Sequence, residues 1–127
     1  MEKLKVLIAH DSPVIRFELM DIIEEYGFEV VGEAENGVQA VLMYQQLKPD
    51  FVTLDIIMPE KDGLAALREI LAYKPTAKIV MVTAMGSKQT LFECIKLGAF
   101  DFIEKPFVKE KIIQTLQKTQ KALNPSN

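Results

Sequence analysis

The chain has 127 residues with 18 acidic and 15 basic side chains, so it is long enough for one domain with a buried core. Its net charge of −3 argues against nucleic-acid binding through a broad basic face, and no apolar run approaches the roughly 20 residues that span a membrane. The N-terminus lacks the layout of a signal peptide, and the one cysteine, Cys94, cannot form an internal disulfide, so we expect a cytoplasmic protein without membrane insertion.

Short apolar runs alternate along the chain with longer stretches that have helical spacing. Continuous Val, Ile and Leu runs are typical of strands buried on both faces, and the intervening helices imply parallel pairing through crossovers. In chain order, we predict strands at residues 5–9, 29–34, 51–54, 78–82 and 102–104, alternating with helices at residues 13–26, 36–47, 64–73, 87–97 and 109–123. Right-handed crossovers with helices on both faces make this a doubly wound α/β sheet, in one domain over residues 1–127 with its core at about 3–123.

Local signals support the ends of these helices. Ser12 is a typical N-cap residue and Pro13 suits the first helical position, whereas Gly27 suits the end of the first helix. Cys94 falls on the apolar side of the fourth predicted helix, so we interpret it as a core residue and not as a nucleophile.

Four of the predicted strands end at a reactive polar side chain. The first is followed by His10 and Asp11, the third by Asp55, the fourth by Thr83 and the fifth by Lys105. Because the carboxyl ends of parallel strands lie on one rim of a sheet, these side chains are expected to converge on one crevice. The combination suits a metal-assisted transfer of a group onto a carboxylate.

The expected chemistry of this cluster starts from its two acids. Unpartnered carboxylates a few ångströms apart repel each other, and a divalent cation such as Mg²⁺ relieves that repulsion at Asp11 and Asp55. The hydroxyl of Thr83 and the ammonium of Lys105 would suit a phosphoryl group carried by Asp55, because its charge needs positioned donors. Each residue taken alone also fits a plain structural role, and it is their order at separate strand ends that favours a site.

These residues carry a resemblance to the receiver domains of response regulators, most closely to the single-domain CheY-like kind. It covers essentially residues 3–123, and all four motifs occur in order with the spacings of the family. The matching segments are His10-Asp11-Ser12, Thr53-Leu-Asp55-Ile-Ile-Met-Pro59 with Asp62-Gly63, Val82-Thr83-Ala84, and Gly98-Ala-Phe-Asp-Phe-Ile-Glu-Lys-Pro-Phe107.

The resemblance implies a flavodoxin-like (β/α)5 fold with strand order 2-1-3-4-5, and a phosphoacceptor role for Asp55. A histidine kinase would supply the phosphoryl group, and Mg²⁺ would be held by Asp11, Asp55 and the backbone carbonyl of Ile57. Thr83 and Lys105 would bind the phosphoryl group. The chain would catalyse only its own phosphorylation and dephosphorylation, and would not be an enzyme for an external substrate.

The resemblance also implies how such a protein would signal. Phe102 would be the switch aromatic that turns inward when Thr83 moves, and Lys105-Pro106 would be a cis peptide. The fourth helix, fifth strand and fifth helix would form the output surface. A downstream target, such as a motor switch protein in a chemotaxis-like two-component pathway, would read it, without direct nucleic-acid binding.

His10 departs from the family, which usually has two acids at the end of the first strand. One interpretation is drift at an outer position, with Asp11 keeping the direct metal contact. The other is altered metal chemistry, because imidazole suits Mn²⁺, Zn²⁺ or Ni²⁺ better than Mg²⁺ and His10 becomes a further candidate ligand. The two nearby carboxylates would favour protonated His10, which could partly replace the metal. We therefore predict weak, pH-dependent Mg²⁺ binding, with Mn²⁺ as the alternative ion.

Two apolar residues bear on the lifetime of the phosphate. Ile57 and Met85 lie two positions after Asp55 and Thr83, where family side chains border the path of the hydrolytic water. Neither can orient water by hydrogen bonding, which predicts slow self-dephosphorylation, unless both only shield the loop backbone.

Alternative functions remain open at this point. The chain could be a pseudo-receiver that binds partners independently of phosphate, or a receiver excised from a longer regulator, although the tail after residue 123 favours a stand-alone protein. A phosphatase with an aspartyl-phosphate intermediate would need an acid two residues after the nucleophile, where this chain has Ile57.

Overall fold

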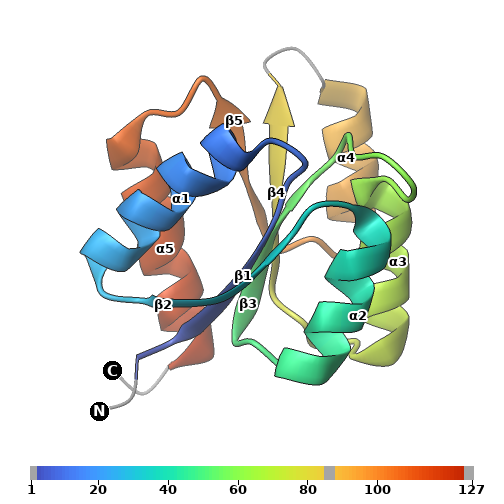
Figure 1. Cartoon of the computed structure of the whole chain (residues 1–127), viewed down its shortest axis with the longest axis horizontal. Helices are drawn as coiled ribbons and strands as arrows, with labels where there is room; N and C mark the ends of the chain where they lie inside the picture. Colours follow the sequence, from blue (N-terminus) through green and yellow to red (C-terminus); the bar gives the residue numbers. More distant parts are fainter. Residues whose placement is uncertain (1–2, 85–87, 125–127) are drawn as a thin grey trace.

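A five-stranded parallel sheet forms the centre of the protein in the computed structural model, which describes residues 3–84 and 88–124 (Figure 1). Its strand order is β2-β1-β3-β4-β5, as predicted. The strands are β1 (Lys5–Ala9), β2 (Glu29–Ala34), β3 (Phe51–Asp55), β4 (Ile79–Ala84) and β5 (Asp101–Lys105).

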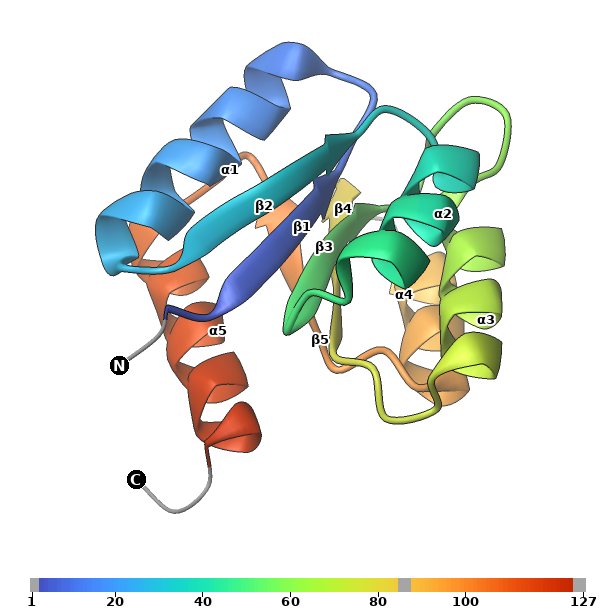
Figure 2. The same ribbon diagram turned by 60° about the horizontal axis from the view of Figure 1, so that its bottom comes forward.

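Each strand is followed by a helix. The helices are α1 (Pro13–Tyr26), α2 (Gly37–Leu47), α3 (Gly63–Tyr73), α4 (Lys88–Leu97) and α5 (Lys109–Leu123). Helices α1 and α5 cover one face of the sheet, and α2, α3 and α4 cover the other, which confirms the doubly wound α/β fold (Figures 1 and 2).

Short polar side chains fix where three of the helices begin. Ser12, Asn36 and Asp62 are N-caps, and their side chains accept hydrogen bonds from the backbone N–H three residues later. Helix α1 ends at Gly27, whose φ of 119° lies in the left-handed region that glycine adopts without strain. The predicted start of the fourth helix at Ser87 lies outside the described residues.

The last three strands run one or two residues further than the apolar pattern predicts. The backbone ladder continues past the apolar runs, pairing Asp55 with Val82 and Ala84 with Lys105. Polar residues can extend a strand because the ladder bonds come from the backbone and not from the side chain. Asp55, Thr83 and Lys105 are therefore held within the strands and do not lie on the loops after them.

The two faces of the sheet bury separate apolar clusters. On one face, Leu19 and Ile23 of α1 pack with Ile112 and Leu116 of α5. The cluster on the other face includes Cys94, which is fully buried and confirms its predicted place in the core. With helices packed on both sides, the open rim at the carboxyl ends of the strands is left for function.

Among the residues that the structure describes, none of the helices has both the length and the apolar content needed to cross a membrane.

Candidate functional site

The carboxyl rim of the sheet brings together the side chains at the ends of β1, β3 and β5. Asp55, at the end of the central strand β3, is only 3% exposed. One of its oxygens, Oδ1, lies 3.2 Å from Nζ of Lys105, and the other, Oδ2, lies 3.4 Å from Nε2 of His10. The predicted convergence is thus present for the groups of β1, β3 and β5, whereas the hydroxyl of Thr83 in β4 contacts the carbonyl of Ala84.

His10 is buried between the two acids of the cluster. Its Nδ1 accepts a hydrogen bond of 3.0 Å from the backbone N–H of Ser12 and lies 3.3 Å from Oδ1 of Asp11. Its Nε2 lies 3.1 Å from Nζ of Lys105 as well as close to Asp55. The ring therefore contacts each of the other charged members of the cluster.

The two carboxylates do raise the pKa of His10, as predicted, but the net shift of this pKa is downward. Burial is the largest single effect and lowers the pKa of His10, and the positive charges of Lys105 and Arg16 lower it further against the opposing charges of Asp55 and Asp11. The acceptor role of Nδ1 toward Ser12 agrees with this direction, because a doubly protonated ring has no lone pair to accept with.

Burial has the opposite effect on the acid at the centre. It raises the pKa of Asp55 above the usual range of a carboxylic acid, although the nearby charges of His10 and Lys105 act to lower it. The folded protein therefore holds this carboxylate in an environment that disfavours its charged form.

Replacing Asp55 with asparagine is expected to stabilise the metal-free protein at neutral pH. A folded-state pKa that is raised means that wild type loses stability as pH rises through that pKa, and the asparagine variant has no such loss. Urea denaturation in chelator, from about pH 4 to about pH 8, should show the advantage of the variant growing with pH. A variant less stable than wild type at neutral pH would contradict the expected strain on Asp55.

The donor set fits a divalent cation. Ligand atoms of His10, Asp11 and Asp55 lie within 4.8 Å of one another, and Asp11 is half-exposed, so an ion can reach it from solvent. Two carboxylates at one crevice suit a hard cation that keeps some of its waters. Ile57 follows in the loop after Asp55, with its side chain 75% exposed.

The other predicted site residues are placed as follows. Thr83 is buried in β4, and its hydroxyl donates to the carbonyl of Ala84 at 3.3 Å. Phe102 is an exposed apolar side chain on β5, and the Lys105-Pro106 bond is cis as predicted. Met85 lies outside the described residues, so the prediction of slow dephosphorylation stays a prediction.

The sequence reasoning missed one buried charged residue behind the site. Arg16 of α1 is 9% exposed, and its Nη1 donates a 2.6 Å hydrogen bond to the backbone carbonyl of His10. Its Nε donates to Glu33 at 3.0 Å. The available signal was spacing, because Arg16 falls on the same helical face as Leu19 and Ile23, where an apolar residue is expected.

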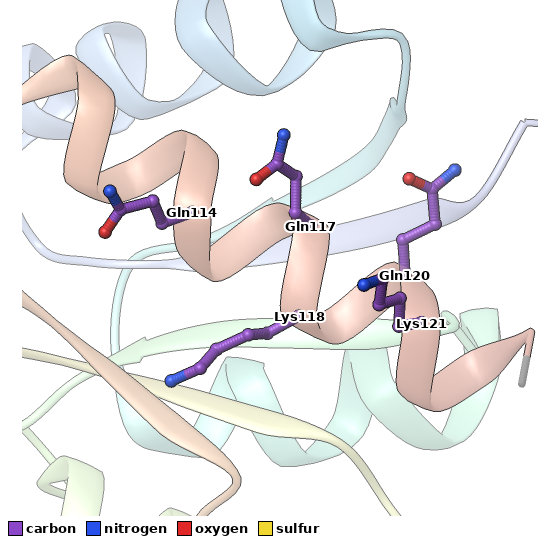
Figure 3. Close-up of a pocket in the computed structure, with 5 residues that line it drawn as sticks. All are labelled: Gln114, Gln117, Lys118, Gln120 and Lys121. Atoms are coloured by element: carbon purple, nitrogen blue, oxygen red, sulfur yellow. The ribbon is translucent and has the colours of Figure 1, made fainter.

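A depression on the outer surface of α5 lies away from this cluster. Figure 3 shows the five side chains that line it, all of which come from α5 and spread outward without meeting at a common centre. They are Gln114, Gln117, Lys118, Gln120 and Lys121. Amide and ammonium groups arranged in this way form a polar surface and not a reactive site.

A comparison with protein families finds one match that spans most of the chain. The model of the response regulator receiver domain matches residues 6–117. Among curated proteins, the chemotaxis protein CheY of Listeria monocytogenes is 48% identical over 118 residues, covering 93% of this chain and 99% of that protein. CheY of Thermotoga maritima is also 48% identical, over 117 residues that cover 92% of this chain and 98% of the relative.

Solved structures with the same fold support the match to the receiver-domain family. The crystal structure of the CheX–CheY–BeF₃–Mg²⁺ complex from Borrelia burgdorferi superposes with a TM-score of 0.88 at 34% identity, covering 92% of this chain and 89% of that chain. The response regulator domain of Thermotoga maritima CheB gives a TM-score of 0.84, also at 34% identity, and covers 97% and 98% of the two chains.

Proposed function

Because the chain belongs to the family of response regulator receiver domains, we propose that it is a CheY-like phosphoacceptor that takes a phosphoryl group onto Asp55. The observation that carries the proposal is the environment of this one carboxylate. Asp55 is buried at the carboxyl rim, with the ammonium of Lys105 on one oxygen and a second acid, Asp11, in the same cluster. The whole chain would act as a single receiver domain.

In the proposed transfer, an oxygen of Asp55 attacks the phosphorus of a phosphohistidine on a histidine kinase. The bond between phosphorus and the imidazole nitrogen breaks as the bond to the Asp55 oxygen forms, and the electron pair returns to the histidine. Lys105, already 3.2 Å from Asp55, would follow the phosphoryl group and compensate its charge, and the Thr83 hydroxyl would exchange its bond to Ala84 for a phosphoryl oxygen.

Asp11, Asp55 and the backbone carbonyl of Ile57 would hold the Mg²⁺ ion. The bound ion would neutralise the carboxylates and the phosphoryl oxygens during transfer. The two carboxylates within the cluster support this assignment, and the Borrelia burgdorferi neighbour is itself a complex with Mg²⁺.

Phosphorylation would be read on the face made by α4, β5 and α5. A movement of Thr83 toward the phosphoryl group would leave space for Phe102 of β5 to turn inward. Phe102 and Val108 now line a groove of about 350 Å³ between β5 and α5, together with lysines such as Lys118. A change in this groove is what a downstream protein, for example a motor switch protein, would detect.

Labelling with a small phosphodonor tests the proposal. Acetyl phosphate or phosphoramidate with Mg²⁺ or Mn²⁺ should add one phosphoryl group to wild type and none to Asp55→Asn, as measured by intact-protein mass spectrometry. The Asp21→Asn variant changes an exposed acid on α1 and should label like wild type. Absence of labelling of wild type with either metal would contradict the proposal and favour a pseudo-receiver that binds partners independently of phosphate. The cytoplasmic location expected from composition stays part of the proposal.

A further inference from the structure

The ring of His10 is fixed by its surroundings on several sides. Its Nδ1 accepts from the backbone N–H of Ser12, which is the N-cap of α1 and is itself held in the first turn of that helix. The backbone of His10 is held as well, because its N–H donates to the carbonyl of Ala34 and its carbonyl accepts from the buried Arg16. Neither the ring nor its support can turn without breaking these bonds.

The contact with Ser12 decides which nitrogen carries the proton. A nitrogen that accepts from an N–H has its lone pair engaged, so a neutral imidazole carries its proton on the other nitrogen. In His10 this puts the proton on Nε2, which lies 3.4 Å from Oδ2 of Asp55. This assignment leaves the 3.1 Å contact between Nε2 and Nζ of Lys105 without a hydrogen bond, and it sets unprotonated Nδ1 3.3 Å from Oδ1 of Asp11. The ammonium can direct its protons to Asp55 and the half-exposed Asp11 can turn toward solvent, whereas the backbone N–H of Ser12 can only donate to Nδ1.

Each oxygen of Asp55 then faces a nitrogen that can donate, with Nζ of Lys105 3.2 Å from Oδ1 and Nε2 of His10 3.4 Å from Oδ2. A cation needs one of these oxygens as a ligand. His10 has no free nitrogen lone pair to offer in exchange, since one is engaged by Ser12 and the other nitrogen carries the proton. Of the three side chains close enough to hold an ion, only the two carboxylates are therefore able to do so.

We propose that His10 is a positioning residue that donates a hydrogen bond to Asp55, and that a divalent cation must displace it to bind. The inference rests on the proposed function in that Asp55 is taken as the metal-binding phosphoacceptor. It sets aside the interpretation of His10 as a further metal ligand and keeps the expected weak Mg²⁺ binding, with a neutral His10 that competes with the metal for Asp55. In the absence of metal, the negative charge of Asp55 would already be partly compensated by His10 and Lys105.

Two substitutions of His10 test whether it competes with the metal for Asp55 or binds the metal as a ligand. In His10→Asn the amide oxygen can take the place of Nδ1 and accept from Ser12, but the side chain is too short to reach Asp55. In His10→Gln the amide nitrogen can take the place of Nε2 and keep the donor to Asp55. Loss of one hydrogen bond to a charged group should make His10→Asn bind both Mg²⁺ and Mn²⁺ about tenfold more tightly than wild type. His10→Gln should stay closer to wild type.

Affinities can be measured by calorimetry for Mg²⁺ and by electron paramagnetic resonance for Mn²⁺. Weaker Mn²⁺ binding in His10→Asn would overturn the proposal and identify His10 as a nitrogen ligand. Equal affinities in wild type and His10→Asn would overturn it as well, since no competition would then exist.

The wild-type protein offers an independent test, because His10 is the one histidine of the chain. Nitrogen-15 NMR of its ring, without metal, should show an unprotonated Nδ1 and a protonated Nε2, and Mg²⁺ should shift the Nε2 signal. A proton on Nδ1, or a ring unaffected by saturating Mg²⁺, would overturn the proposal. None of these readouts requires phosphate transfer, so failure of Asp55 to label would refute the proposed function and leave this test standing.

Discussion

Replacing Gly63 with alanine is expected to destabilise the protein by about 3 kcal/mol or more. A Cβ at this position would lie 2.0 Å from the carbonyl oxygen of Asp55 and 2.7 Å from Cα of Ile56. Both are backbone atoms, and the N–H of Gly63 also donates to the carbonyl of Ile56 at 2.7 Å. The loop after Asp55 therefore packs directly on the start of α3, and an added methyl group must push the end of β3 away from it.

Gly32→Ala is the matched control for this substitution. Its Cβ would lie 2.7 Å from Cδ1 of Leu47 and 2.8 Å from Cε of Met43, which are the free ends of flexible side chains. Urea denaturation should show a clearly smaller loss for Gly32→Ala than for Gly63→Ala, and only Gly63→Ala should impair labelling of its folded fraction by acetyl phosphate. Equal losses would mean that the backbone at Asp55 can yield as easily as a side chain.

Replacing Arg16 with methionine is expected to cost about 3 kcal/mol of stability. The change removes a charge-assisted 2.6 Å hydrogen bond and leaves the carbonyl of His10 without its donor. Methionine can fill part of the volume on α1, so most of the loss would come from the unpaired carbonyl and not from a cavity. The bond to Glu33 contributes less, because that carboxylate is substantially exposed to solvent.

Loss of Arg16 is also expected to weaken metal binding, because Arg16 holds the end of β1. Without the guanidinium, the strand end that carries His10 and Asp11 should loosen, so that Asp11 loses its fixed position as a ligand and Mg²⁺ affinity falls together with stability. His10→Asn, which leaves Arg16 and the position of Asp11 unchanged, should instead raise that affinity. Arg16→Lys keeps the positive charge but not the planar guanidinium that bonds His10 and Glu33 together. The stability of Arg16→Lys should therefore lie between those of wild type and Arg16→Met. Denaturation and metal titration of the three proteins check this order, and a Met variant as stable as wild type would remove the role assigned to Arg16.

Much of the fold was predictable because its signals are local. Apolar runs, helical spacing and residues such as Ser12, Pro13 and Gly27 act over a few positions, and the parallel sheet follows from their alternation. The strand ends were placed too early at β3, β4 and β5, because hydrophobicity ends before the backbone ladder does. Which groups line the rim was nonetheless predictable, since residues at strand ends share one edge in this topology.

The protonation and the hydrogen bonds of those groups were not predictable, because they depend on distances between segments far apart in the chain. The sequence places His10 beside acids and so favours its charged form, but burial and the approach of Lys105 reverse that expectation. The contact between Arg16 and the end of β1, and the close packing of Gly63 on Asp55, likewise exist only once the layers have assembled. The sequence by itself therefore determined the architecture, the family and the members of the site. Only the tertiary structure decided which of these members are buried and which of their atoms face one another, because desolvation and hydrogen-bond geometry arise from packing and not from residue order.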